Sequence, residues 1–482
     1  MTLLSIILVP IFIATLSFFV KKNIQPLEKL AFFTALCEPA LLFFILKGVV
    51  NEGNSSFAPY FLVDRLGAIV MLTVVLVGST SLIYSIGYLR EEVKKNIIGF
   101  HRVRQYFILA HLFLSSMLFA ISTVNPIAMW IAIEATTLST VFLISFYNKP
   151  TSIEAAWKYF VVNSIGLLLG FFGTLLYFTP IKNISSAGLI EWNTIILNAG
   201  NFDPLILKIA FVFVFIGYGT KVGLAPMHTW LPDAHSKAPS PISALLSGSL
   251  LNVAMLAILR FKIITDTAIS PDFSHGLFVA FGTVSLIVTS FIIFIQKNYK
   301  RLFAYSSIEH MGIVSLGFGF GGIGAVASLF HMVYHSIVKS ILFFSAGNIF
   351  LKYSSTKMAN IGGVLRILPI TGTILFIGIL AITGVPPFGI FITKIYILSA
   401  GIQNYPIIVL VSLVLLAIIF AGFLGHASGI LFGNAPKGIL EGEMNYFTII
   451  PSLFLVFVLV WMSVFPPLVL KSLIYSASAL IK

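Results

Sequence analysis

Charged residues are scarce in this sequence. Asp, Glu, Lys and Arg make up 9% of the 482 residues, whereas 58% are hydrophobic. A soluble domain needs many more charged groups on its water-facing surface, so soluble α/β enzymes and barrels with a solvated shell are excluded. Apolar residues in this proportion must face lipid or one another. The composition therefore predicts an all-α polytopic membrane protein.

Cysteine is almost absent as well. Cys37 is the only one, and it lies in an apolar segment, so the chain cannot form a disulfide framework. Iron–sulfur clusters and most nickel or iron redox sites need several thiolate ligands. We therefore expect no cofactor in this chain, and any electron transfer coupled to it must occur on another subunit.

A secretory signal is also missing from the first apolar segment. Residues 1–20 have no basic leader and no cleavage site with small residues, and Lys21 and Lys22 follow directly. We expect this segment to be a retained first helix.

Apolar segments long enough to span a membrane predict about fourteen transmembrane helices. They begin near Met1, Leu30, Gly67, Gln105, Asn125, Tyr159, Pro204, Pro241, His275, Leu302, Gly324, Leu368, Tyr405 and Phe447. The connections between them are too short to hold an additional domain.

Basic residues give the net charge of +13, but they are spread over short connections and form no basic face for nucleic acid. Alternate connections are rich in them, as in the segment Arg90–Arg104. The poorer side has Lys47, Arg65, Lys182, Arg260, Lys262, Lys471 and Lys482. The positive-inside rule then places the richer side in the cytoplasm and both termini outside.

One stretch, Gly217–Arg260, interrupts two long apolar runs. It begins GYGTKVGLAPMHTWLPDAHSKAPSP, with Lys221, His228 and several prolines close together. An ammonium group inside an apolar run that then breaks at prolines is typical of a discontinuous membrane helix lining a polar cavity. The alternative is an ordinary helix end whose lysine reaches the membrane surface.

A weak internal repeat relates the fourth to eighth expected helices to the ninth to thirteenth. Each block ends in a broken helix and its successor, and the second break is Thr383–Gly389 (TGVPPFG). Matching positions hold Glu134, Lys158 and Lys221 in the first block and Glu309, Lys339 and Lys394 in the second. Because each block has five helices, an odd number, consecutive copies enter the membrane from opposite sides, and the repeat is inverted. We expect an N-terminal three-helix unit (1–104), two repeats (105–265 and 266–432) and a C-terminal helix (433–482).

Glu134 lies near the centre of an apolar helix. A carboxylate in the membrane is costly unless it is protonated or paired, so it indicates a functional site. The alternative is a structural ion pair with a neighbouring lysine.

His331, His335 and Lys339 lie in SLFHMVYHSIVKSILFF. Their spacing of four places them on one helical face, about 6 Å apart along the axis. Neutral imidazole both donates and accepts, so such a row can relay protons. A metal site and a purely structural role are the alternatives, although no acidic or thiol ligand follows in the motif.

Four further positions are ambiguous. Lys394 follows the second break, and Lys158 lies near the start of its helix, so either lysine can be a path residue or can reach the membrane surface. Glu309 and His310, in AYSSIEHMG, belong either to the path or to a helix start.

The stretch KVGLAPMHTWLPDAHSKAPSPISALLSG resembles the signature of proton-translocating antiporter-like subunits. These subunits are shared by respiratory complex I, Mrp-type sodium/proton antiporters and group 4 membrane-bound [NiFe] hydrogenases. The likeness covers nearly the whole chain, and EAAWKYFVVNSIGLLLGFFGTLLYF is most similar to hydrogenase-4 component F of formate hydrogenlyase-like complexes.

This resemblance implies roles for the buried charges. Each repeat would form one half-channel, and Glu134 and Lys221 would interact in the first. Lys339 with His331 and His335 would form the central relay, and Lys394 would be the terminal site. It implies Fe–S and Ni–Fe centres on partner subunits. Asn252 departs from the family, which often has Lys or His there, so the link between the half-channels would run through water, His228 or other groups. A sodium/proton antiporter subunit and a non-pumping membrane anchor stay open as alternatives.

Overall fold

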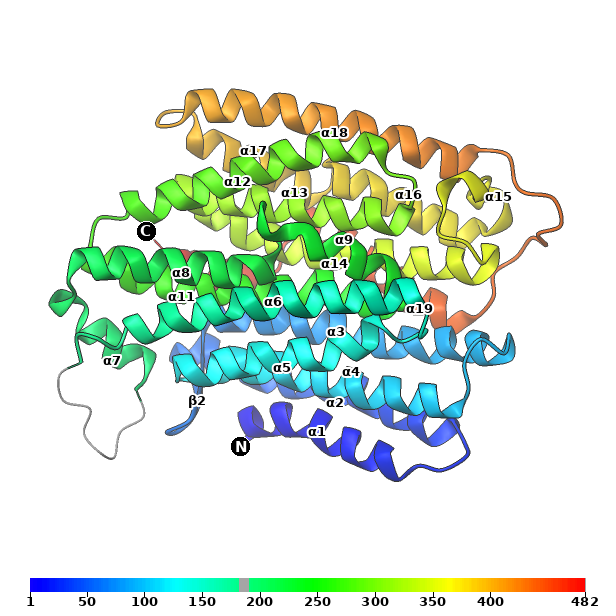
Figure 1. Cartoon of the computed structure of the whole chain (residues 1–482), viewed down its shortest axis with the longest axis horizontal. Helices are drawn as coiled ribbons and strands as arrows, with labels where there is room; N and C mark the ends of the chain where they lie inside the picture. The colour runs from blue at the N-terminus through cyan, green and yellow to red at the C-terminus, as the bar shows by residue number, and fades with distance from the viewer. Residues whose placement is uncertain (182–189, 482) are drawn as a thin grey trace.

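Long apolar helices lying side by side make up almost all of the protein (Figure 1). The structure is a computed structural model that describes residues 1–181 and 190–481. Helix α1 lies at one edge of the bundle and α18 at the opposite edge, with α3 and α14 between them (Figure 1). Lys182 and Lys482, which we assigned to the side poor in basic residues, lie outside the described residues.

The elements follow the expected order. The first part of the chain forms α1 (Thr2–Phe19), α2 (Gln25–Glu52), β1 (Asn54–Phe57), β2 (Phe61–Asp64) and α3 (Arg65–Lys94). The first expected repeat contains α4 (Phe100–Ser122), α5 (Pro126–Ile144), α6 (Pro150–Leu176), α7 (Trp192–Leu197), η1 (Ala199–Asn201), α8 (Pro204–Val222), η2 (Met227–Thr229), α9 (Trp230–Lys237), α10 (Ser240–Leu245), η3 (Leu246–Leu250) and α11 (Leu251–Ala268).

The second expected repeat and the C-terminal part contain α12 (Asp272–Ile292), η4 (Ile293–Ile295), α13 (Tyr299–Phe320), α14 (Ile323–Tyr353), η5 (Met358–Asn360), α15 (Val364–Ile367), α16 (Pro369–Thr383), α17 (Gly389–Gly401), α18 (Pro406–Phe432), α19 (Tyr446–Val464) and α20 (Leu468–Ser478). The short helix α20 has no counterpart in the sequence analysis, which expected one C-terminal helix.

The predicted helical membrane fold is confirmed. Within the described residues, 12 helices are long and apolar enough to cross a membrane. Helix α13 and the broken pair α16–α17 are additional apolar elements in the positions of expected spans. The total of about fourteen spans, the inverted repeat and the repeat boundaries stay predictions.

The connection after α2 differs from the all-α expectation. Strands β1 and β2 pair antiparallel, with Asn54 opposite Asp64 and Phe57 opposite Phe61. The segment lies between two apolar helices, where its backbone groups can pair with each other in a hairpin. This two-stranded sheet is too small to change the fold class.

The most buried helices lie in the middle of the bundle. The most apolar window of α10–α11 (Ser240–Ala268) is 100% buried, and that of α14 is 94% buried. In α2 and α18 only 33% of the most apolar window is buried, so most of the apolar surface of these two helices faces outward. Ionisable side chains on the inner helices are therefore shielded from both lipid and bulk solvent.

Glycine ends the first half of each broken helix. Gly223 follows α8 with a φ of +81°, and Gly384 follows α16 with a φ of +82°. Only glycine adopts this left-handed conformation without steric cost, so these positions stop the helices at the expected breaks. A π-helical turn, η3, also interrupts the helix that runs from α10 into α11.

Two basic residues are not where we placed them. Arg260 and Lys262 were assigned to a connection, but both lie inside α11, where Lys262 pairs with Asp266 one turn further on. Asp64 pairs with Arg260 at 3.1 Å (Oδ1 to Nη2), and not with its neighbour Arg65. An apolar-run count misplaces such residues because a buried ion pair allows a helix to continue past them.

Candidate functional site

The first cluster joins α5, α6 and α8 around Lys221. This ammonium group is fully buried in the last turn of α8 and donates to Thr137 Oγ1 and to the Tyr159 hydroxyl, each at 2.8 Å. The Thr137 hydroxyl donates to the Glu134 carboxylate at 3.3 Å, and Ser164 donates to the other carboxylate oxygen at 2.8 Å. Glu134 and Lys221 are thus connected through one threonine hydroxyl.

Lys158 lies at the edge of this cluster. Its side chain is 44% exposed and pairs with Asp233 at 2.7 Å, while the other oxygen of Asp233 contacts Arg301. His228, in η2, is mostly buried, and its Nδ1 has no hydrogen-bond partner among the described residues. The structure therefore places Lys158 at the exposed edge of this cluster and His228 inside the break.

Replacing Lys158 with alanine is expected to have a small effect. An exposed ion pair contributes about 0–1 kcal/mol, and Asp233 keeps Arg301 as a partner. We expect the thermal unfolding midpoint of the solubilised protein to move little, and ion movement in vesicles to change less than about twofold. A loss as large as that of a fully buried lysine would show that Lys158 is an obligatory path residue.

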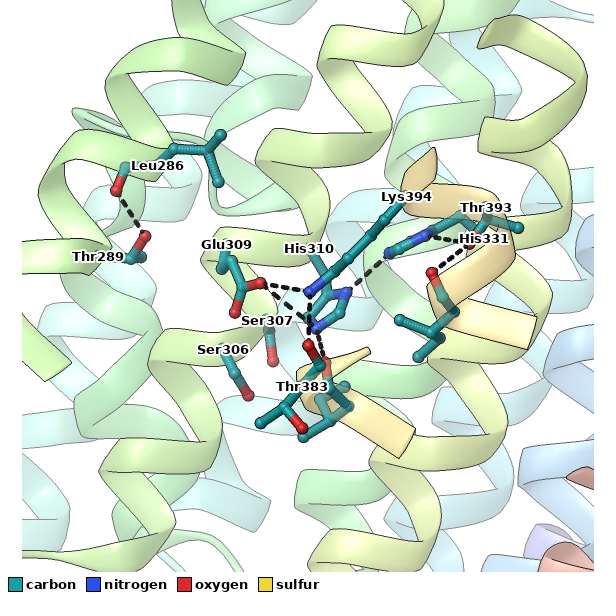
Figure 2. A network of polar contacts seen from close by, with 12 residues as sticks. Leu286, Thr289, Ser306, Ser307, Glu309, His310, His331, Thr383, Thr393 and Lys394 are labelled. Atoms are coloured by element: carbon teal, nitrogen blue, oxygen red, sulfur yellow. Dashed lines mark hydrogen bonds and ion pairs between the residues drawn. The ribbon is translucent and has the colours of Figure 1, made fainter. Parts of the chain in front are cut away.

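The second cluster centres on a buried ion pair between α13 and α17. Lys394 Nζ lies 3.0 Å from Glu309 Oε1, and both side chains are largely buried. Figure 2 shows the ammonium group of Lys394 between Glu309, His310 and Thr383. The sequence predicted a helix from near Leu302, with Glu309 either on the path or at the helix start. Because Asn298 caps α13 at Lys300 and Arg301, Glu309 lies near the middle of the helix.

Backbone groups of the second break complete this cluster. Pro386 and Pro387 have no N–H, so they cannot donate to the carbonyls of Ile382 and Thr383 four residues earlier. The Ile382 carbonyl instead accepts from His310 Nε2 at 3.0 Å, and the Thr383 carbonyl lies 3.5 Å from Lys394 Nζ. The broken helix therefore supplies acceptors that a continuous helix would use internally.

Three side chains form a continuous hydrogen-bonded series next to the ion pair. His310 Nδ1 and His331 Nε2 are 2.7 Å apart, and His331 Nδ1 and Thr393 Oγ1 are 2.8 Å apart. The series crosses from α13 through α14 to α17 (Figure 2). It can carry a proton between helices, since imidazole and hydroxyl groups both donate and accept.

The expected row on α14 is not hydrogen-bonded along its length. Neither ring nitrogen of His335 has a partner among the described residues, although its ring centroid is 5.4 Å from that of His310. Lys339 is fully buried and donates to the Phe303 carbonyl at 2.6 Å and to Ser306 Oγ at 2.5 Å. A spacing of four aligns these groups, but only cross-helix partners connect them.

Small polar groups lie between the two clusters. Ser247 in η3 and Ser307 in α13 share a hydrogen bond of 2.8 Å, and Ser307 is adjacent to Ser306, a partner of Lys339. Asn252, the position where the family often has Lys or His, donates to Ser336 on α14 at 2.8 Å. These serine and asparagine side chains carry hydroxyl and amide groups, which can donate and accept hydrogen bonds without adding a charge.

Two buried histidines add to the predicted path residues. His310, which the sequence left open as a path or a helix-start residue, contacts His331 and the Ile382 carbonyl. His235 is fully buried, and neither of its ring nitrogens has a partner among the described residues. Thr137 connects Glu134 to Lys221, and Thr393 contacts His331 and the Ile390 carbonyl, but an isolated threonine has no sequence signal. Glu38 on α2 is another buried carboxyl without a hydrogen-bond partner in the described part of the chain. An ionisable residue inside an apolar run is the signal that identifies His310 and Glu38.

No three His, Cys, Asp or Glu side chains gather as metal ligands would within residues 1–181 and 190–481. The nitrogens of His331 are instead occupied by His310 and Thr393. Hydrogen bonds and one ion pair therefore account for the polar groups of the second cluster.

The fold matches solved membrane complexes over nearly its whole length. One similar chain belongs to the membrane-bound sulfane sulfur reductase, an archaeal respiratory membrane complex, with a TM-score of 0.87 and 22% identity over 99% of this chain and 97% of that chain. Another belongs to the Mrp complex from Dietzia sp. DQ12-45-1b, with a TM-score of 0.83 and 17% identity over 99% and 95% of the two chains. Fold and site together define a polytopic membrane protein with ionisable groups along its interior.

A family model described as NADH:quinone oxidoreductase/Mrp antiporter matches residues 123–420, and the model of the complex I chain 5 N-terminus matches residues 50–96. The chain belongs to this family of antiporter-like membrane subunits. It is 39% identical to a hydrogenase-4 component F homolog of Methylacidiphilum infernorum (isolate V4), over 72% of this chain and 74% of the relative. It is 29% identical to hydrogenase-4 component B of Escherichia coli (strain K12), over 69% of this chain and about half (49%) of that longer relative.

Proposed function

We propose that this chain moves protons through the membrane as one subunit of a respiratory oxidoreductase complex, of the group 4 membrane-bound hydrogenase or formate hydrogenlyase-like type. The observation that carries the proposal is the set of ionisable groups buried in mid-bundle, above all the Lys394–Glu309 pair with the adjoining histidines. Groups of this kind inside a membrane protein mark ion pathways by default.

The path uses the residues that the two clusters contain. Lys158 and Asp233 form the exposed entrance, and Glu134, Lys221 and His228 form the first half-channel. The central and terminal sites of the second half-channel are Lys339, His335, His331, Glu309 and Lys394, to which we add His310.

The mechanism is electrostatic. When Glu134 or Thr137 moves away, the proton on Lys221 is less stabilised and passes through hydroxyl groups and water towards Lys339. Changing the separation of two unit charges by several ångströms is worth about 2 kcal/mol at an effective dielectric constant of 20. Moving one charge across about 100 mV costs about 2.3 kcal/mol, so the two energies are comparable.

Other subunits supply the chemistry. We propose that Fe–S and [NiFe] centres lie on peripheral partners, because the chain has a single cysteine and cannot hold such clusters. The complex lies in the cytoplasmic membrane of a bacterium or archaeon, with the basic connections inside and both termini outside. The relative of 39% identity, a hydrogenase-4 component F homolog, supports this type of complex.

The test is ion movement by the purified complex in proteoliposomes, with its subunits identified by mass spectrometry. Proton uptake and release are followed during redox turnover for the wild type, Lys221→Met and the control variant Lys352→Ala, whose lysine contacts the Gly442 carbonyl and belongs to neither cluster. We expect Lys221→Met to lower proton movement by about a hundredfold, since a positioned proton-transfer group contributes about 10²–10⁴-fold, while redox turnover continues.

The outcomes separate the alternatives. Sodium-dependent flux without Fe–S partners would indicate an Mrp-type antiporter subunit instead. Redox turnover without proton movement in the wild type would indicate a membrane anchor whose buried charges are static pairs.

A further inference from the structure

A cavity of about 310 Å³ lies beside the second cluster, between α14, α17 and the α19–α20 segment. Its polar lining consists of Tyr334, Thr393, Tyr396, Ser463, Lys471 and Tyr475. The volume is sufficient for several water molecules, and the hydroxyl groups provide partners for them.

The cavity reaches one end of the molecule. Ile323 and Val326, at the start of α14, line it, while Lys352 lies at the other end of the same helix, where the basic connections gather. The cavity therefore extends from mid-bundle towards the face opposite those connections.

Thr393 separates this cavity from the histidines. Its side chain lines the cavity, is 4% exposed, and contacts His331 Nδ1 at 2.8 Å. Its hydroxyl also lies 2.9 Å from the Ile390 carbonyl oxygen. One hydroxyl group thus stands between the His310–His331 pair and the cavity.

The protons of this series can be assigned. The Ile382 carbonyl only accepts, so His310 carries a proton on Nε2. If both rings are neutral, His331 Nε2–H donates to His310 Nδ1, and the Thr393 hydroxyl donates to His331 Nδ1. If His331 holds one additional proton, its Nδ1–H donates to Thr393, whose hydroxyl then donates to Ile390. The hydroxyl has an acceptor in both states, so His310, His331 and Thr393 stay linked by hydrogen bonds whether or not the additional proton is present.

We propose that Thr393 is the release group of the second half-channel and passes protons from His331 into this cavity. The inference rests on the proposed function, and it names the exit. In the step, the Nδ1–H proton of His331 transfers to Thr393 Oγ1 while the hydroxyl proton leaves to a water molecule in the cavity. The transferred proton then lies between Oγ1 and the neutral Nδ1, so the hydroxyl donates to Nδ1 again, and it rotates away only when His331 gains its next proton.

Proton release by the complex in proteoliposomes tests the assignment. Thr393→Val keeps the shape of the side chain and removes the hydroxyl, whereas Thr393→Ser keeps the hydroxyl. Thr289→Val on α12 is the matched control, because the Thr289 hydroxyl donates to the Ser285 and Leu286 carbonyls of its own helix, the second of which Figure 2 shows. We expect at least a tenfold loss of proton release for Thr393→Val, and less than a twofold change for the other two.

Cysteine labelling gives a second measurement that does not need turnover. In a Cys37→Ser background, Val326→Cys lines the cavity and should react with a membrane-impermeant thiol reagent from the outer face only. Val161→Cys, on the exposed side of α6 and away from the cavity, should not react from either side of the membrane.

Two results would overturn the exit assignment. One is wild-type proton release by assembled Thr393→Val complex under conditions where Lys221→Met abolishes it, which leaves the proposed function intact. The other is failure of Val326→Cys to react from the outer face. Absence of proton movement in the wild type would instead refute the proposed function itself.

Discussion

Replacing Lys339 with alanine is expected to abolish proton movement while the complex still assembles and turns over. Lys339 is fully buried between the two clusters, and its ammonium group is held by Phe303 and Ser306. Alanine cannot carry a proton, so we expect proton release to fall by about a hundredfold or more. Proton uptake and release in proteoliposomes, normalised to redox turnover, measure this effect.

Assembly should survive this change for a structural reason. Ser306 already lies within hydrogen-bond distance of the Phe303 carbonyl, at 3.0 Å, so neither acceptor of Lys339 is left without a partner. Lys352→Ala on the same helix is the control, because Lys352 contacts the Gly442 carbonyl at the helix end. Equal proton release by the wild type and by assembled Lys339→Ala complex would remove Lys339 from the path and favour the anchor alternative.

Removing one partner of the Glu309–Lys394 pair is expected to destabilise the protein strongly. Breaking a buried ion pair leaves an uncompensated charge and costs about 3–5 kcal/mol of unfolding free energy. We therefore expect Glu309→Gln and Lys394→Met each to lower the unfolding midpoint of the solubilised protein. The double variant should recover much of the loss, because it leaves no charge unpaired.

The exposed pair Arg366–Glu441 provides the matched control for this double-mutant cycle. Its side chains are 79% and 56% exposed, so Arg366→Ala should leave the midpoint unchanged within error. Additive losses for the two buried substitutions would mean that the side chains do not interact. Both single variants should also lose proton movement, which separates this pair from one that only holds helices together.

The sequence predicted the parts of the fold that depend on composition and on local backbone chemistry. Long apolar runs became helices, and the prolines predicted both breaks, since α8 ends just before Pro226 and α16 ends at Thr383. The hairpin after α2 and helix α20 were not predicted, because both are short and depend on packing against neighbouring helices.

The site was predictable where a charge interrupts an apolar run. Lys221, Lys339 and Lys394 are all buried, which removes the alternative of lysines that reach the membrane surface. Partners across helices could not be read from spacing. The row on α14 suggested contacts along one helix, yet His331 bonds to His310 and Thr393 from two other helices. Hydroxyl groups such as Thr137 Oγ1 gave no signal because threonine is common in membrane helices.

The backbone carbonyls at the second break contact His310 and Lys394, and this determines which substitutions the site tolerates during evolution. The acceptor for His310 is the backbone oxygen of Ile382, so its identity does not depend on the side chain at that position. Substitutions at residue 382 can accumulate without altering the acceptor, whereas replacing Pro386 restores a competing N–H donor. We therefore expect related sequences to keep Pro386 and Pro387 and to vary at residue 382.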